Sequence, residues 1–136
     1  MPDLSGMELD NRINEHANIF KMIIKRIHTA MVIVKIIMSA HPKKRKELLQ
    51  TLLSLIEAVR QENGCRSYQV FQDIENDNVF CLIEEWDSLE AAKNHMKSAG
   101  FGVLLGTKIL LNKDHDIQIH TLLQTENSRH ESDIIK

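Results

Sequence analysis

The segment between residues 62 and 86 decides the fold of this chain. It begins with Glu62-Asn63-Gly64-Cys65-Arg66-Ser67-Tyr68-Gln69-Val70-Phe71-Gln72-Asp73 and ends with Asn78-Val79-Phe80-Cys81-Leu82-Ile83-Glu84-Glu85-Trp86. Asn63-Gly64 is typical of a helix end, because glycine tolerates the left-handed backbone found there. Two runs rich in aromatic and β-branched residues flank a polar turn at 74–78. They predict a hairpin with strands at about 66–73 and 78–86.

Glu84 and Trp86 lie on one face of this hairpin, because side chains alternate along a strand. If the hairpin is symmetric about its turn, Cys65 pairs with Trp86, and Cys81 lies far along the ladder. The face of Glu84 would then also carry Cys65, Ser67, Gln69, Phe71, Phe80 and Leu82, and the opposite face Tyr68, Val70, Val79, Cys81 and Ile83. A mixed polar and aromatic face suits a pocket for a flat aromatic ligand. The alternative is that Trp86 anchors the core and Glu84 forms an interface salt bridge.

The rest of the pattern places this hairpin in a larger sheet. Residues 31–38 are apolar on both alternating faces, which is typical of a central strand covered on both sides. A helix follows from 42 to about 63, with a predicted buried stripe of Leu48, Leu49, Leu52, Ile56 and Val59. Beyond the hairpin we expect a helix at 89–97, a short helix to about 111, and a strand at 116–123.

The order strand, helix, strand, strand, helix, strand predicts an α+β fold of the ferredoxin-like, split βαβ type. In this fold a four-stranded antiparallel sheet has its helices on one face. The doubly apolar first strand implies that the other face is covered too. A second copy of the chain is the simplest cover, so we expect a homodimer.

Residues 1–30 differ from the remainder. Their apolar residues recur at three- and four-residue steps, which predicts an amphipathic helix over about 7–28 with a stripe of Leu9, Ile13, Ala17, Phe20, Ile24 and Ile27. The expected division is therefore an N-terminal amphipathic helical extension at 1–30, the folded domain at 31–124, and a flexible polar C-terminal tail at 125–136.

Composition excludes several classes of function. The chain has 136 residues and a net charge of −2, which gives no electrostatic reason to expect nucleic acid or an anionic membrane as a partner. It has no apolar run near the ~20 residues of a membrane helix, and its acidic start is unlike a secretory leader. We therefore expect a cytoplasmic protein with two free cysteines. The seven histidines lack metal-site spacing, so no metal is expected.

His95 is the candidate for acid–base chemistry. It lies three residues after Ala92 and so borders the buried side of its predicted helix. An imidazole titrates in the useful range, so His95 could accept a proton from a phenolic hydroxyl. The alternative is a boundary histidine held by a backbone carbonyl. The basic run at 43–46 has a similar pair of interpretations, an anion site or a solvated face.

Three motifs carry a resemblance to a known family: Glu62-Asn63-Gly64-Cys65-Arg66-Ser67-Tyr68, then Glu84-Glu85-Trp86, then His95-Met96-Lys97-Ser98-Ala99-Gly100-Phe101. In order and spacing, residues 31–123 resemble the antibiotic-biosynthesis-monooxygenase family of dimeric α+β barrel proteins, which includes quinol monooxygenases. The resemblance implies a cofactor-independent monooxygenase that uses O2 to oxidise a small aromatic such as a quinol. It implies that His95 and Glu84 are catalytic and that Trp86 and Phe101 bind the substrate.

Two departures from relatives qualify this expectation. Many family members have a histidine just before the residue that matches Phe101, and this chain has Gly100 there. Haem-degrading relatives have an axial histidine where this chain has Leu105. They also have an asparagine on their first strand, and the first strand predicted here, at 31–38, contains no asparagine. We therefore do not expect haem. The alternative function is a non-catalytic dimeric module that binds a small molecule or serves a signalling assembly.

Overall fold

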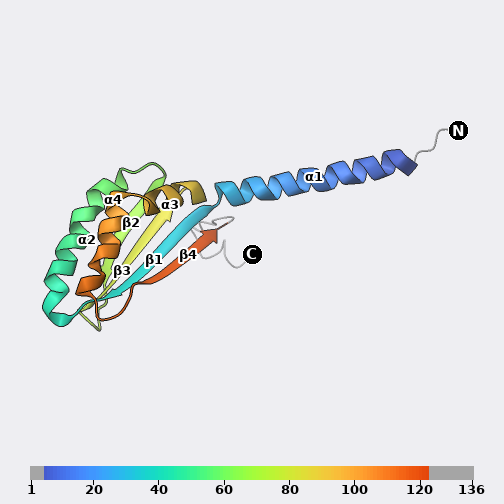
Figure 1. Ribbon diagram of the computed structural model, residues 1–136. Helices are drawn as coiled ribbons and strands as arrows, with labels where there is room; N and C mark the ends of the chain where they lie inside the picture. The colour runs from blue at the N-terminus through green and yellow to red at the C-terminus, as the bar shows by residue number, and fades with distance from the viewer. Residues whose placement is uncertain (1–4, 123–136) are drawn as a thin grey trace, which may run out of the picture.

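A computed structural model describes residues 5–122 of the chain, with side chains placed at 10–24 and 30–122. The elements in chain order are α1 (Ser5–Thr29), β1 (Met31–Ser39), η1 (Pro42–Lys44), α2 (Arg45–Arg60), β2 (Cys65–Gln72), β3 (Val79–Trp86), α3 (Leu89–Met96), α4 (Ala99–Gly106), η2 (Thr107–Leu110) and β4 (Asp116–Leu122). The four strands form one antiparallel sheet in the order β2-β3-β1-β4. The predicted α+β, ferredoxin-like fold is confirmed (Figure 1). The predicted tail at 125–136 lies outside the described residues.

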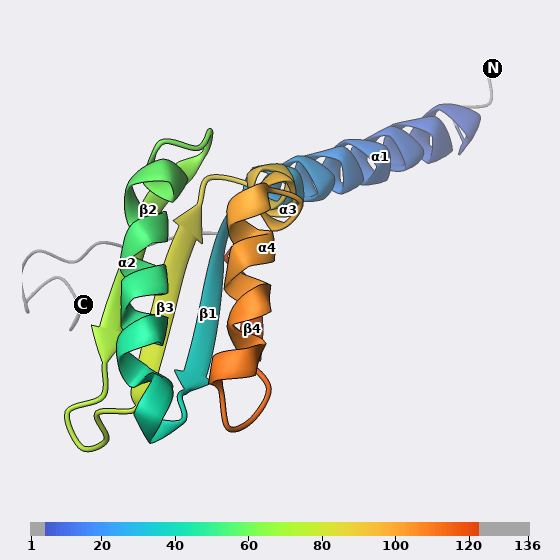
Figure 2. The ribbon, with the colours of Figure 1, turned by 60° about the vertical axis from the view of Figure 1, so that its left-hand side comes forward.

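The core lies between the sheet and the helices, because α2 and α4 run across the same face (Figure 2). On β1 every second residue is fully buried there: Val32, Val34, Ile36 and Met38. From α2 the buried residues are Leu48, Leu52, Leu55 and Val59. The stripe therefore differs slightly from the prediction: Leu55 is buried, whereas Leu49 and Ile56 pack at its margin.

The outer face of the sheet has no described helix over it (Figure 2). Ile33 and Ile37 of β1 and Cys81 and Ile83 of β3 are half-buried there, beside Lys35. The second apolar face predicted for the first strand is therefore present, but a single chain leaves it partly exposed. Neighbouring apolar side chains left partly exposed on a sheet face are a candidate protein–protein contact.

The hairpin contains a β-bulge that the symmetric register did not anticipate. Cys65 pairs with Trp86 as expected, but the register shifts between Cys65 and Ser67, and Tyr68 then pairs with Glu84. A bulge inserts one extra residue into one strand and so exchanges the two faces beyond it. The side-chain grouping predicted for β2 is therefore wrong from Ser67 onward: Tyr68 and Val70 share the face of Glu84, and Ser67, Gln69 and Phe71 face outward.

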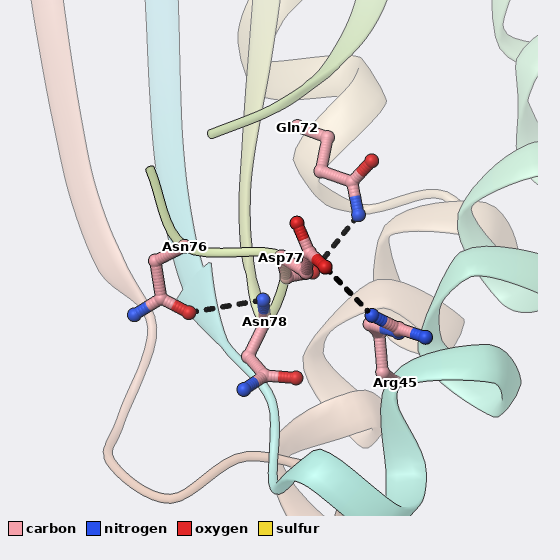
Figure 3. A network of polar contacts seen from close by, with 5 residues as sticks. All are labelled: Arg45, Gln72, Asn76, Asp77 and Asn78. Atoms are coloured by element: carbon pink, nitrogen blue, oxygen red, sulfur yellow. Dashed lines mark hydrogen bonds and ion pairs between the residues drawn. The ribbon is translucent and has the colours of Figure 1, made fainter. Parts of the chain in front are cut away.

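A polar network fixes the turn between β2 and β3 (Figure 3). The Arg45 guanidinium donates to a carboxylate oxygen of Asp77 at 3.3 Å, and the side-chain amide of Gln72 donates to the Asp77 carbonyl at 2.9 Å. The Asn76 side chain accepts from the backbone N–H of Asn78 at 3.1 Å. The basic run at 43–46 thus ties the start of α2 to the hairpin through Arg45.

Helix α1 confirms the helix expected in the N-terminal extension. It continues directly into β1 and runs away from the domain, with α3 beside its C-terminal end (Figure 1). Every side chain placed between residues 10 and 24 is exposed. Within the described part of the chain, no helix is both long enough and apolar enough to cross a membrane.

Candidate functional site

His95 is the centre of a cluster of buried polar and aromatic side chains. It lies on α3, whose N-cap is Ser88, and the Ser88 hydroxyl accepts from the Ala91 N–H at 3.1 Å. This N-cap fixes the helix rotation, so Ala92 and His95 both turn toward the sheet, and His95 is only 3% exposed. The imidazole therefore lies under β3, in the interior and away from bulk water.

Three aromatic rings surround the imidazole. Trp86 stacks on it with ring centroids 4.6 Å apart and planes 25° apart. Phe101 meets it edge-on at 5.5 Å, and α4 holds this ring in place because the Ser98 hydroxyl caps the Phe101 N–H at 3.2 Å. Tyr68 approaches edge-on at 6.4 Å. All four residues nominated from the sequence, Glu84, Trp86, His95 and Phe101, thus lie together.

Two carboxylates bracket the imidazole. Nδ1 of His95 is 2.5 Å from Oε2 of Glu62, and Nε2 is 2.7 Å from Oε1 of Glu84. The second contact is a close charge contact rather than an aligned hydrogen bond. Burial alone would lower the pKa of His95. The close contact with the Glu84 carboxylate, and then the hydrogen bond to Glu62 and its charge, outweigh burial, and the pKa of His95 is raised. This raised pKa favours the imidazolium form of His95, which lies between the two carboxyl groups.

Two polar atoms of the cluster have neither a hydrogen-bond partner nor an ion-pair contact among the described residues. These are Oε2 of Glu84 and Nε1 of Trp86, and both side chains are fully buried. Leaving a buried polar atom unpaired costs roughly 1–3 kcal/mol, so such atoms are uncommon in folded proteins.

Glu62 is a site residue that the sequence analysis missed. It follows α2, and its partner His95 is 33 positions later in the chain, so no local pattern links them. Gly64 makes the approach possible: its φ is +83°, and a Cβ there would stand 2.5 Å from the Cβ of Ala91 on α3. Gly64 was the feature of the sequence that could have indicated this contact, because glycine allows two segments to approach closely.

Tyr68 is the second residue that was missed. The bulge turns it inward, opposite Glu84 on β3, where it is 1% exposed. Burial, and then the charges of Glu84 and Glu62, raise the pKa of the Tyr68 phenol. The hydroxyl therefore stays protonated at neutral pH and can serve only as a neutral donor or acceptor.

A small pocket opens onto this cluster. It has a volume of about 230 Å³ and is lined by Glu62, Asn63, Trp86, Ala91, Asn94 and His95. A larger hollow of about 520 Å³ lies elsewhere, at Glu47, Thr51 and Thr107, and its lining contains no histidine or aromatic residue. The smaller pocket is therefore the better candidate, because acid–base and aromatic groups meet at its wall.

The cluster is not arranged to hold a metal ion. Glu62 and Glu84 contact opposite nitrogens of the same ring, so their oxygens do not converge on a point. Among the residues whose side chains are placed, no group of three or more histidine, cysteine, aspartate or glutamate residues has the geometry of a metal site. Cys65 and Cys81 are free thiols, as predicted.

The fold and this site define a small α+β protein with one open sheet face and a buried Glu–His–Glu cluster. Residues 31–104 match the family model described as antibiotic biosynthesis monooxygenase, and the chain belongs to that family. The family resemblance inferred from the three sequence motifs is confirmed.

Individual relatives agree with this assignment. The chain is 31% identical over 88 residues to the Bacillus subtilis protein named "Putative monooxygenase YcnE", a match that covers 64% of this chain and 93% of the relative. It is 30% identical over 86 residues to the uncharacterized protein sll1783 of Synechocystis, covering 62% of this chain and 58% of that one. A crystal structure from Deinococcus radiodurans, titled a "putative antibiotic biosynthesis monooxygenase", superposes with a TM-score of 0.66 at 30% identity, covering 73% of this chain and 99% of that one. Residues 1–30 lie outside the family match.

Proposed function

We propose that this protein is a cofactor-independent monooxygenase that oxidises a small, electron-rich aromatic such as a quinol. One observation carries the proposal: the pocket of about 230 Å³ has an indole, an imidazole and a carboxylate in the same wall, from Trp86, His95 and Glu62. The family supplies the class of reaction, and the pocket supplies the size and polarity of the substrate.

The aromatic side chains would hold the substrate ring. Trp86 lines the pocket and stacks on His95, and Phe101, which does not line the pocket, packs edge-on against the same imidazole. A phenolic hydroxyl in the pocket could accept from Nε1 of Trp86, a pocket-lining residue whose N–H lacks a partner. Satisfying this N–H would favour a substrate with a polar edge over a plain hydrocarbon ring.

The proton would be taken by Glu62, His95 and Glu84 acting together. Both ring nitrogens of His95 contact carboxylates, so an imidazolium in this position has no free site for another proton. Glu62 lines the pocket, and its side chain is 29% exposed, whereas that of Glu84 is fully buried. Glu62 is therefore the first acceptor that a substrate hydroxyl would meet. His95 and Glu84 would position it and balance its charge.

The reaction needs only the substrate and O2. Loss of the hydroxyl proton gives an electron-rich anion that reduces O2. One oxygen atom then bonds to a ring carbon, and the second leaves as water with two hydrogens that came from the substrate. A hydroquinone would thus give a hydroxyquinone and one water. The protein contributes the proton acceptor, the orientation of the ring and a site of low water content.

Oxygen consumption tests this proposal. The full chain is incubated aerobically with hydroquinones and hydroxynaphthalenes, and O2 uptake and product mass are followed. We expect turnover with at least one of them, a fall of about a hundredfold or more in His95→Gln and Glu62→Gln, and a clear loss in Trp86→Phe. Glu85→Gln, on the outer face, serves as the matched control. Turnover that is unchanged in these variants would contradict the assigned roles, and no turnover across the panel would contradict the proposed activity.

We also propose that a second copy of the chain covers the outer face of the sheet. Ile33, Ile37 and Ile83 give this face an apolar centre that the chain itself leaves half exposed. Light scattering should show a multiple of the 15.7 kDa chain, and Ile83→Lys should halve it. Ile74→Lys is the control, because Ile74 lies in the hairpin turn and is 97% exposed. A mass that Ile83→Lys leaves unchanged would place the contact elsewhere.

The second candidate function is a non-catalytic dimeric module that binds a small molecule or serves a signalling assembly. The apolar stripe that α1 exposes and the glycine at position 100 favour it. Binding of quinols without oxygen uptake, seen by calorimetry with the same panel, would support this module over the enzyme.

A further inference from the structure

Helix α1 exposes an apolar stripe that the rest of the described chain does not cover. Ile13 is 56% exposed and Phe20 is 64% exposed, and Ala17 and Ile24 are exposed beside them on the same helix face. A helix usually draws its stability from packing such a stripe against a partner rather than from intrinsic propensity. Because α1 runs clear of the domain formed by the described residues, that partner lies outside the described part of the chain (Figure 1).

The spacing of the stripe is the same in both directions along the helix. Ile13, Ala17, Phe20 and Ile24 follow steps of four, three and four residues, so the stripe is symmetric about the midpoint between residues 18 and 19. If a second α1 is laid antiparallel about that midpoint, Ile13 lies against Ile24 of the other copy and Ala17 lies against Phe20. The small Ala17 leaves room for the large Phe20 ring, which is how helices interlock at close range.

The charge of the helix selects the same orientation. In the sequence, residues 8–15 contain three acidic residues and one basic residue, whereas residues 21–26 contain three basic residues and no acidic one. Two antiparallel copies place the acidic half of each beside the basic half of the other. Two parallel copies place like charges together, which is unfavourable.

We propose that α1 is a self-association helix and that its partner is α1 of a second copy, packed antiparallel through Ile13, Ala17, Phe20 and Ile24. This contact is separate from the outer face of the sheet and does not depend on the proposed enzymatic activity. Together, the two distinct self-contacts would join dimers into a larger assembly, whose mass Ile83→Lys would halve by removing the contact at the sheet face.

Disulfide trapping tests both the contact and its direction. Two full-length variants, Ile13→Cys and Ile24→Cys, are prepared, one with a tag that changes its size on a gel. They are mixed, allowed to exchange subunits and oxidised mildly. The antiparallel pair predicts that the mixed 13–24 product dominates over the 13–13 and 24–24 products. The unsubstituted chain, treated identically, gives the background from Cys65 and Cys81.

Charge variants show whether the apolar stripe is responsible. Phe20→Glu, added to both cysteine chains, should remove the mixed product, whereas Asn18→Glu places the same charge off the stripe and should leave it. Circular dichroism checks that the domain stays folded. Dominant same-position products would mean a parallel pair, and no product above background would mean another occupant. A mixed product that survives Phe20→Glu would show that the stripe is not the contact. Each of these results overturns the proposal.

Discussion

The two faces of the sheet are built from the same strands, yet they accommodate a carboxylate in opposite ways. Glu84 and Glu85 are adjacent on β3 and point to opposite faces. Glu84 is fully buried beside His95, whereas Glu85 lies half-buried on the outer face between β1 and β2. A buried charge is tolerated only with an opposite charge and hydrogen bonds nearby. The comparison shows that the helix-side face contains a buried charged cluster in place of apolar side chains. The outer face contains no such cluster among the described residues.

The largest expected effect on stability comes from substituting these two adjacent glutamates. Glu84→Gln should lower the free energy of unfolding by about 3–5 kcal/mol, because it removes one partner of a buried charge pair. Glu85→Gln, one residue along, should change it by less than about 0.5 kcal/mol. Urea unfolding of both variants at neutral pH measures the difference. Equal effects would mean that the burial of Glu84 imposes no special requirement on the fold.

The second effect acts on the segment that brings Glu62 to the cluster. Gly64→Ala should cost about 2–4 kcal/mol, because the left-handed backbone and the 2.5 Å contact with Ala91 must both be relieved. Gly102→Ala is the matched control, since a Cβ there meets nothing within 4 Å. That control should be neutral or slightly stabilising, as alanine favours a helix. Thermal unfolding of the pair is sufficient, and a tolerated Gly64→Ala would contradict the close approach.

The third effect is a pH dependence that comes from the helix-side face. The pKa of His95 is raised above its ordinary value of 6.5, so the folded state holds a proton that the unfolded state releases first. Its stabilising contribution is complete below 6.5 and is lost as the pH rises through the folded-state pKa. The free energy of unfolding should therefore fall with pH above 6.5.

Two comparisons isolate this effect. In Glu62→Gln the decline should end at a lower pH, because one of the groups that raise the pKa of His95 is gone. His115 does not interfere, since burial lowers its pKa and its contribution therefore changes below 6.5. The thiols of Cys65 and Cys81, whose pKa values burial raises above 9.0, act only at higher pH. A free energy of unfolding that does not fall as the pH rises above 6.5 would contradict the raised pKa of His95.

The smallest effect concerns the position where many relatives have histidine. A Cβ at Gly100 would meet its neighbours at 3.9 Å, an ordinary contact distance. Gly100→His should therefore change stability by no more than about 1 kcal/mol, with Gly100→Ala as the control for helix propensity alone. Differential scanning calorimetry would measure both. A large loss would show that glycine is required here for packing, not merely tolerated.

The strands and helices were predicted well from the sequence, because each depends on a local pattern of apolar and polar residues. The alternation at 79–86 and the apolar run at 31–38 need only their own residues to be interpreted. Grouping Glu84 with Trp86 was equally secure, since two residues along a strand share a face whatever the register. The family motifs added His95 and Phe101, which the structure places against that pair.

What could not be predicted depends on contacts between distant segments. The bulge at 65–67 has no distinct residue signature, so Tyr68 was assigned to the wrong face. Glu62 follows α2 as a polar residue near a helix end, and nothing near it in the sequence indicates His95. Both residues are placed by how β2 and α3 meet at Gly64, which is a property of the packed structure and not of either segment.

The bulge also shows where this strand can change length in evolution. Removing the extra residue between Cys65 and Ser67 would leave a regular ladder in which Cys65 still pairs with Trp86 and Tyr68 with Glu84. A deletion between Tyr68 and Gln72, with the turn and β3 unaltered, would instead shift Tyr68 by one place and send its side chain to the outer face. Among related proteins, a gap at position 66 is therefore compatible with the same pocket lining, whereas a gap between Tyr68 and Gln72 marks a different set of β2 side chains.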